Sequence, residues 1–173
     1  MTKLKSNNPY REGNEMTTVS VDRRALLCGL GVAGFSAALP AFASSQPLVQ
    51  VVKDPDCGCC GAWINIMSAD GFQMEVHEAP YEALVRLKEQ RGISEDMASC
   101  HTAQVGGYVI EGHVPPHDVR RLLSEQPEAI GLSVPGMPWG SPGMGPDSER
   151  DTYSVFLILK DGTTEVFTHY EAH

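Results

Sequence analysis

The segment Cys57-Gly58-Cys59-Cys60 crowds three thiols into four residues and is the strongest chemical signal in the chain. It follows a short apolar run and precedes a pattern typical of a helix. Free N–H groups and the positive dipole end at a helix N-terminus stabilise thiolates and lower the thiol pKa. Thiolate is both the nucleophile of thiol chemistry and a ligand for soft metals. Disulfide staples explain this crowding poorly, because a staple gains stability by closing a long loop.

A fourth thiol and an imidazole stand side by side at Cys100-His101. We expect this loop, which precedes a predicted strand, to pack against the segment 57–60, so that both groups face the first three sulfurs. His113 comes at the end of the same predicted strand, and we expect it to point inward as a further ligand. The alternative for Cys100-His101 is a lone buried cysteine beside a surface histidine.

Four thiolates with histidine nearby form a soft site, and soft ligands select copper(I), zinc or iron–sulfur clusters. Zinc sites usually combine separated pairs of Cys or His, and iron–sulfur sites use wider cysteine spacing. Crowded thiolates can bridge several copper(I) ions in one cluster. The pattern therefore favours copper(I), with more than one ion per chain.

Two methionines, Met137 and Met144, lie in a loop of unusual glycine and proline content at residues 131–145. Thioether sulfur is also a soft ligand, which makes both residues candidate copper ligands. A hydrophobic contact between the loop and the body of the domain would explain them equally well. His169 and His173, at the end of the chain, are expected to be solvated.

Hydrophobic periodicity predicts the elements that must position these groups. Strands are expected at residues 47–53, 72–77, 102–110, 153–159 and 164–170, and helices at residues 60–70, 80–91 and 115–123. Gly106-Gly107 is expected to form a bulge or turn within the third strand. Within the first helix, Trp63, Ile66 and Met67 form the predicted inward face. Asp161-Gly162 marks a hairpin turn between the last two strands. The predicted order is βαβαβα, a loop, and ββ.

Such alternation of strands and helices predicts an α/β sandwich. Cys57 and Cys60 have C-x-x-C spacing at the end of the first strand and the start of the first helix, which favours a thioredoxin-like fold. Redox enzymes of that fold usually carry a proline in the loop before the third strand. The corresponding loop here, Ser99-Cys100-His101-Thr102, has none.

The N-terminal segment predicts export. Arg23-Arg24 precedes an uncharged apolar run of 15 residues, 25–39, and Ala41-Phe42-Ala43 supplies small residues for cleavage. This pattern is typical of a secretory signal of the twin-arginine kind, and the run is short for a membrane span of about 20 residues. We therefore expect residues 1–43 to be an extension and signal peptide, and residues 44–173 to be one exported, periplasmic-type domain. Met1 and Met16 both remain candidate start sites.

The net negative charge of residues 44–173 indicates which partners the processed chain can bind. The whole sequence has 13 Lys and Arg and 22 Asp and Glu, of which residues 44–173 keep 8 and 19, a net charge of −11. So acidic a protein does not suit binding to nucleic acid or to an anionic membrane surface. Metal cations, copper ions above all, are the expected partners, together with other copper-handling proteins.

Four blocks in order carry a resemblance to a known family. They are D-P-D-C-G-C-C-G-A-W at 54–63, S-C-H-T-A at 99–103, G-Y-V-I-E-G-H-V-P at 107–115 and G-L-S-V-P-G-M-P-x-G-S-P-G-M at 131–144. These blocks resemble the CopG-like family of exported metal-binding proteins, which is associated with copper resistance. The resemblance implies a thioredoxin-like fold, a copper cluster and redox activity toward copper(I). It implies as ligands Cys57, Cys59, Cys60 and Cys100, followed by His101 and His113.

Other functions stay open on the sequence. A thiol–disulfide oxidoreductase would explain the C-x-x-C spacing at a helix start, although the extra cysteine inside the motif and the missing proline argue against it. A metallochaperone would pass copper to a partner, and an enzyme would oxidise copper on the cluster. Binding of copper(I) for detoxification or handling outside the cytoplasm is the interpretation that the sequence favours.

Overall fold

The structure is a computed structural model, and it describes residues 46–173. The predicted signal peptide and its cleavage site after Ala43 lie outside these residues.

Seven strands and three α-helices make up the described chain. The strands are β1 (Leu48–Lys53), β2 (Gln73–Glu78), β3 (His101–Val105), β4 (Tyr108–Glu111), β5 (Ala129–Ser133), β6 (Tyr153–Leu159) and β7 (Thr164–Tyr170). The helices are α1 (Gly58–Ala69), α2 (Tyr81–Gln90) and α3 (Pro116–Glu125). Their order along the chain is β1-α1-β2-α2-β3-β4-α3-β5-β6-β7. Short 3-10 helices lie at Glu95–Met97, between α2 and β3, and at Asp147–Glu149, between β5 and β6.

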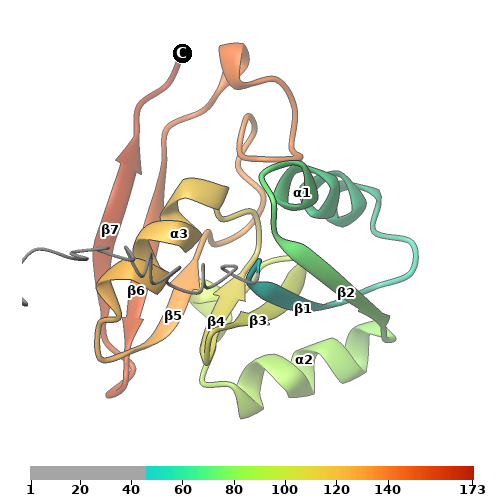
Figure 1. Ribbon diagram of the computed structural model, residues 1–173, viewed down its shortest axis with the longest axis vertical. Helices are drawn as coiled ribbons and strands as arrows, with labels where there is room; N and C mark the ends of the chain where they lie inside the picture. Colours follow the sequence, from blue (N-terminus) through green and yellow to red (C-terminus); the bar gives the residue numbers. More distant parts are fainter. Residues whose placement is uncertain (1–45) are drawn as a thin grey trace, which may run out of the picture. The chain divides into compact units, whose positions relative to one another are not determined.

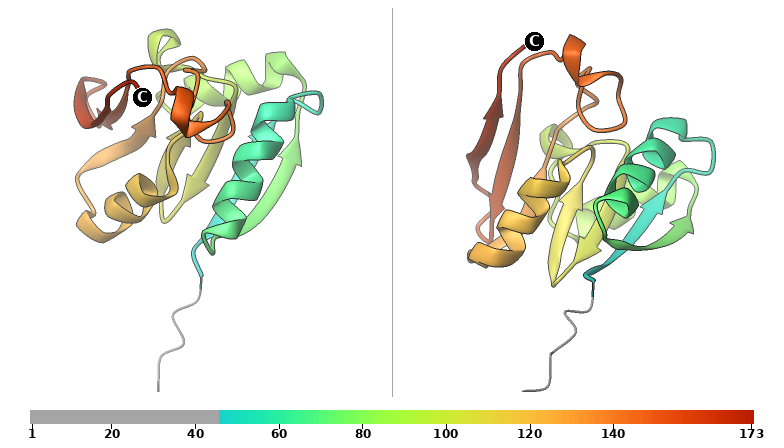
Figure 2. Two further views of the ribbon diagram at one scale, coloured as in Figure 1. Left: turned by 90° about the horizontal axis from the view of Figure 1, so that it is seen from above. Right: turned by 45° about the horizontal axis from the view of Figure 1, so that its top comes forward.

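All seven strands belong to one sheet with the order β2-β1-β3-β4-β5-β6-β7. The pairs β1–β2 and β4–β5 are parallel, and the other neighbours are antiparallel. Helices α1 and α3 cover one face of the sheet, and α2 lies on the other face (Figures 1 and 2). The loop that leads into α1 and the start of β3 are neighbours, because β1 and β3 pair with Lys53 opposite His101.

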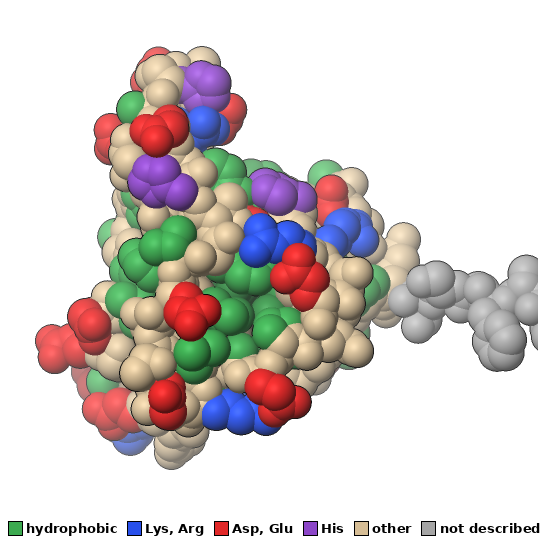
Figure 3. Space-filling model, turned by 90° about the vertical axis from the view of Figure 1, so that its left-hand side faces the viewer, with side chains coloured by type: hydrophobic (Ala, Val, Ile, Leu, Met, Phe, Trp, Pro, Cys, Tyr) green, Lys and Arg blue, Asp and Glu red, His purple; other side chains and the backbone are tan. Residues whose placement is uncertain are grey.

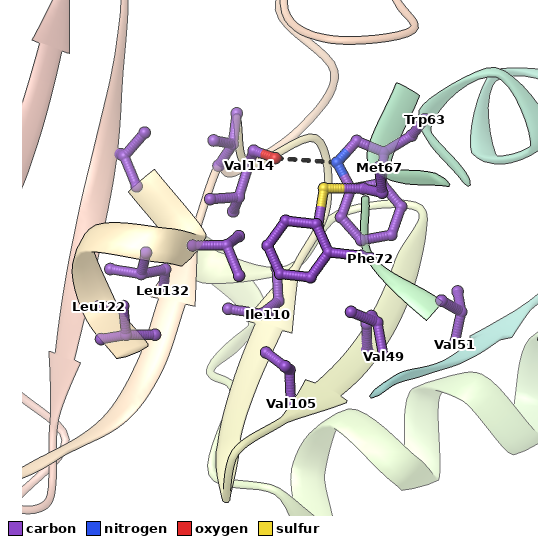
Figure 4. Close-up of a cluster of buried hydrophobic side chains, with 14 of the residues drawn as sticks. Val49, Val51, Trp63, Met67, Phe72, Val105, Ile110, Val114, Leu122 and Leu132 are labelled. Carbon is purple, nitrogen blue, oxygen red and sulfur yellow. Dashed lines mark hydrogen bonds between the residues drawn. The ribbon is translucent and has the colours of Figure 1, made fainter. Parts of the chain in front are cut away.

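The main core fills the space between the sheet and the helices α1 and α3 (Figure 4). Trp63 and Met67 of α1 are fully buried there, and full burial of one such side chain stabilises a fold by about 2–3 kcal/mol. The indole Nε1 of Trp63 donates a hydrogen bond to the carbonyl oxygen of Val114 at 2.9 Å. Side chains alternate across a strand, so β4 directs Ile110 into this core and Glu111 toward α2.

The inward stripe of α1 differs by one residue from the prediction. Cys60, Trp63 and Met67 are buried, whereas Ile66, which was assigned to this face, is 37% exposed. The residues at i, i+3 and i+7 from Cys60 share one side of a 3.6-residue helix, and Ile66 falls beside that stripe. The cysteine at the start of the helix therefore belongs to the buried face.

The predicted α/β sandwich is confirmed, with two corrections to the order of its strands. Residues 102–110 are predicted to form one strand with a bulge or turn at Gly106-Gly107, and in the structure these glycines reverse the chain and make the hairpin β3–β4. Residues 131–133 were assigned to the Gly/Pro-rich loop, but they complete β5, which pairs in parallel with β4. The hairpin β6–β7 has its predicted bounds, and the thioredoxin-like assignment itself stays a prediction.

The surface is consistent with an acidic chain. On the face drawn in Figure 3, the Lys and Arg side chains lie beside Asp and Glu side chains and form no continuous basic patch. Among the described residues, Arg121 forms an ion pair with Glu125, and Lys160 forms one with Glu128. Within residues 46–173, no helix combines the length and the apolar composition that crossing a membrane requires.

Candidate metal centre

The first turn of α1 presents three of the predicted cysteines. Cys57 is the N-cap residue, and its N–H donates to the carbonyl oxygen of Asp54 at 3.1 Å, which closes a tight turn after β1. Cys57 and Cys60 are joined by a disulfide, and Cys59 is a free thiol. The disulfide differs from the expectation of free thiols in this segment. Its physical reason is the C-x-x-C spacing, because one helical turn brings these two side chains together.

The loop before β3 brings the fourth cysteine to the same place. The four sulfurs of Cys57, Cys59, Cys60 and Cys100 all lie within 4.8 Å of one another. The sulfurs of Cys57 and Cys59 are 3.5 Å apart. The structure therefore brings together the four cysteines that the sequence singled out, including the one that is distant in the chain.

A second donor group shares Cys100 with the first. Its sulfur lies 3.0 Å from His113 Nε2 and 3.3 Å from His101 Nδ1, and the three donor atoms lie within 4.8 Å of one another. His101 opens β3, and His113 lies just beyond β4, after Gly112, so the β3–β4 hairpin carries both histidines to one end of the sheet. Both are fully buried.

The ring of His113 is oriented by the Gly/Pro-rich loop. Its Nδ1 lies 2.7 Å from the carbonyl oxygen of Pro142, which can only accept, so this nitrogen carries the proton. The other nitrogen, Nε2, then has a free lone pair directed at Cys100. Metal-binding histidines commonly have their second nitrogen held in this way.

His101 is packed against the indole of Trp63, with ring centroids 4.5 Å apart, and its Nε2 is buried without a hydrogen-bond partner. Burial lowers the pKa of His101 well below its usual range, and the nearby cationic groups, the protonated form of His113 and Lys88, act in the same direction. Burial also lowers the pKa of His113, although the hydrogen bond to Pro142 opposes the shift. Both imidazoles are therefore neutral at pH 7, which is the form that binds metals.

Burial acts on Cys100 in the opposite sense. It raises the pKa of this thiol to about 12, and the neighbouring Cys59 adds to the rise. A soft metal that binds here displaces the thiol proton, because only thiolate is a strong ligand. Metal binding at Cys100 therefore releases a proton near neutral pH.

The two methionines lie at the edge of this region. Met137 is 54% exposed and lines a cavity of about 570 Å³ that also borders Cys57 and Cys100. Met144 is half-buried and follows Gly143, whose φ is +90°. A Cβ at Gly143 would come within 2.8 Å of the backbone nitrogen of Trp63. Only glycine therefore allows the loop to lie this close to the start of α1.

Sequence reasoning missed a buried charged network beside Cys100. Lys88 of α2 and Glu111 of β4 form an ion pair, with Nζ 2.6 Å from Oε1, and Thr102 bonds to both. Lys88 is 7% exposed and Glu111 is fully buried. The signal was present, since Lys88 lies four residues after the inward-facing Leu84 and Glu111 ends an apolar strand.

The donor set is soft and of two kinds. Four sulfurs and two imidazole nitrogens suit copper(I) and zinc better than hard cations. With Cys57 and Cys60 in the disulfide, Cys59, Cys100 and the two histidines are the donors available, and reduction of the disulfide adds two thiolates. The residues present therefore fit a soft metal, and the number of sulfur donors depends on the redox state.

Comparisons with known proteins agree with this chemistry. Residues 97–144 match the family model described as "Protein of unknown function, DUF411", a stretch that contains Cys100, both buried histidines and both methionines. Two solved structures of the copper resistance protein CopG are similar. Form 1 has 36% identity over 73% of this chain and 100% of its own, with a TM-score of 0.68. Form 2 has 35% identity over 72% and 98%, with a TM-score of 0.67. No curated protein matches the chain.

Proposed function

The chain belongs to the CopG-like copper-resistance family, and from this premise we propose that it is an exported protein that binds copper(I) through its convergent cysteines and histidines. The similarity to CopG and the cysteine cluster support a role in copper handling. The preference for copper(I), the export and the individual ligands are parts of the proposal.

The observation that carries the proposal is the position of Cys100. Its sulfur belongs both to the four-sulfur group and to the group with His101 and His113. A thiolate at this point can bridge metal ions held by the two groups. Copper(I) forms such thiolate-bridged clusters readily, whereas a tetrahedral zinc ion would use four of these donors at once.

The proposed ligands form a graded set. Cys57, Cys59, Cys60 and Cys100 supply the sulfurs, and His101 and His113 supply neutral imidazole nitrogen. Met137 and Met144 are proposed as peripheral thioether donors, because they come from the loop that borders the site.

Full occupation of the four-sulfur group requires a reduced chain. Reduction of the Cys57–Cys60 disulfide takes two electrons from a dithiol or another thiol reductant and gives two thiols, each of which loses its proton on binding copper. The proposed function therefore depends on a reductant outside the chain, and the oxidised chain retains only the donors that the disulfide leaves free.

Competitive titration tests the proposal. The reduced chain is mixed with copper(I) held by a chromophoric chelator, and the copper transferred per chain is measured with and without zinc. We expect more than one copper(I) per chain and no displacement by zinc. One copper or none, together with tight zinc binding, would contradict the proposal.

A second candidate function is thiol–disulfide exchange, which the disulfide at the N-terminus of α1 favours. Reduction of insulin by the metal-free chain measures it on the same sample. The copper-binding proposal expects slow insulin reduction alongside high copper content. Fast reduction with negligible copper would favour the oxidoreductase.

A further inference from the structure

A buried network of hydrogen bonds surrounds the backbone just before and after Cys100 and His101. Glu111 Oε1 accepts from the Ser99 N–H at 2.6 Å and from Lys88 Nζ at 2.6 Å. Its Oε2 accepts from the Thr102 hydroxyl at 2.7 Å, and Lys88 also donates to Thr102 at 2.9 Å. Both carboxylate oxygens are therefore used, and the residues they hold flank the Cys100-His101 pair.

The segment is fixed from the other side as well. Ser99 forms an isolated parallel bridge with Gly136, and its hydroxyl donates to the Gly136 carbonyl oxygen. Gly112, with φ +70°, lies directly against Ser99, where a Cβ would meet the hydroxyl oxygen at 2.3 Å. Ser99 is thus held between the carboxylate of Glu111 and the loop after β5, and Cys100 follows it directly.

Stability alone is a weak reason for such a network. Removing two charges from water costs several kcal/mol per ion, and apolar replacements of a buried pair are often neutral or stabilising. The hydrogen bond from the Ser99 N–H, in contrast, fixes the direction in which the chain enters Cys100. An apolar pair would fill the same volume without supplying an acceptor at this point.

We propose that Glu111, neutralised by Lys88, is a positioning residue that fixes Ser99 and so aims Cys100 at the cysteines of the α1 turn. The inference rests on the proposed function, because it identifies what aligns the shared ligand. Neither Lys88 nor Glu111 binds the metal itself. Each acts through the backbone of the 99–102 segment, on the side of the sheet that α2 covers.

Two double variants isolate the hydrogen bond. Lys88→Met/Glu111→Gln removes both charges but keeps an amide oxygen for the Ser99 N–H. Lys88→Met/Glu111→Leu removes the same charges and also the acceptor. Because the two variants are equally uncharged, a difference between them reports the hydrogen bond. Arg120→Gln serves as a control, since it breaks the exposed ion pair with Asp70 at the far end of α1.

Two measurements are made on the full chain. The first is copper(I) affinity of the reduced chain, and the second is the rate of iodoacetamide labelling of the Cys100 peptide, followed by mass spectrometry without copper. The Leu variant should bind copper(I) about tenfold or more weakly, as loss of an outer-shell partner typically does, and should label faster at Cys100. The Gln variant and Arg120→Gln should stay close to the parent chain in both.

Equal affinity and equal labelling in the Leu and Gln variants would overturn the inference. A parent chain that binds no copper(I) would instead refute the proposed function, while the labelling comparison would still test the positioning. If the Leu variant does not fold, Lys88→Met/Glu111→Val replaces it, because valine suits a strand and likewise lacks an acceptor for the Ser99 N–H. Cys100 should then label faster than in the parent, and an unchanged rate would also overturn the inference.

Discussion

Two of the regions that carry histidines differ in what surrounds the rings. At the sulfur-rich end, His101 and His113 are fully buried and converge on Cys100. Along β7 and after it, the side chains of His169 and His173 are 47% and 55% exposed, and each lies beside a carboxylate, of Glu171 and Asp147 respectively. The difference teaches that a histidine becomes a candidate ligand when its ring is buried and lies close to other donor atoms. The residue type alone does not distinguish it from a solvated side chain.

The largest effect is expected from Cys100→Ser. Serine has nearly the size of cysteine but is a hard, protonated donor, so it removes the sulfur shared by both donor groups and spares the packing. We expect the reduced chain to lose at least one copper(I) and about tenfold or more in affinity, or ~1.4 kcal/mol or more. Copper bound per chain measures this loss, and circular dichroism of the same sample checks that the variant is folded. Unchanged copper would confine the site to residues 57–60.

His113→Ala should have the next largest effect. It removes a neutral nitrogen donor and the hydrogen bond to Pro142 that orients it, while the four cysteines remain. We expect weaker copper(I) binding, with less loss than in Cys100→Ser, in the same chelator competition. His117→Ala is the matched control, because His117 is an exposed histidine that contacts Tyr170 and Asp118 away from the sulfurs. Equal loss in both variants would argue against a specific role for His113.

Met137→Ala and Met144→Ala should each have a small effect. A thioether is a weaker donor than a thiolate, and Met137 is largely exposed at the rim of the cavity. We expect copper per chain to stay unchanged, with a modest rise in the rate at which a chelator removes copper. Stopped-flow transfer to the chelator measures this rate. A loss of copper as large as that of Cys100→Ser would promote either methionine to a principal ligand.

The smallest effect, none, is expected from His169→Ala and His173→Ala. Both rings lie outside the buried donor groups, and a surface ion pair contributes only about 0–1 kcal/mol to stability. Copper content and the thermal melting temperature of the double variant should match those of the parent chain. A reduced copper count would show that exposed histidines also contribute to binding.

The sequence predicted the parts of the fold that depend on local residue patterns. C-x-x-C spacing before an apolar helix placed Cys57 and Cys60 on one turn, and the Asp161-Gly162 turn placed the last hairpin. Gly106-Gly107 was recognised as a bulge or turn, but its effect depends on β4 pairing with β5, a contact between distant residues. Strand β5 was missed because a glycine separates its apolar residues Ile130 and Leu132, so the strand is stabilised by pairing with neighbouring strands and not by propensity.

The donor residues of the candidate site were predicted from their types, but the buried network that holds them in place was not. Cysteine, histidine and methionine are visible as soft donors in any sequence, so the list could be written without coordinates. Lys88 and Glu111 gave only a weak signal, namely their places on an inward helix face and at the end of an apolar strand, because a charged residue in a helix or strand usually faces water. Their role follows only from the alternation of β4 and the position of α2, which together bury both charges next to Ser99.

X-ray absorption at the copper edge tests the central claim most directly. The reduced chain is loaded with copper(I), and its first coordination shell is compared with that of the His101→Ala/His113→Ala double variant. The account predicts copper(I) with a dominant sulfur shell and a minor nitrogen contribution that the double variant loses. A shell of nitrogen and oxygen alone, or a nitrogen contribution that persists in the double variant, would contradict it.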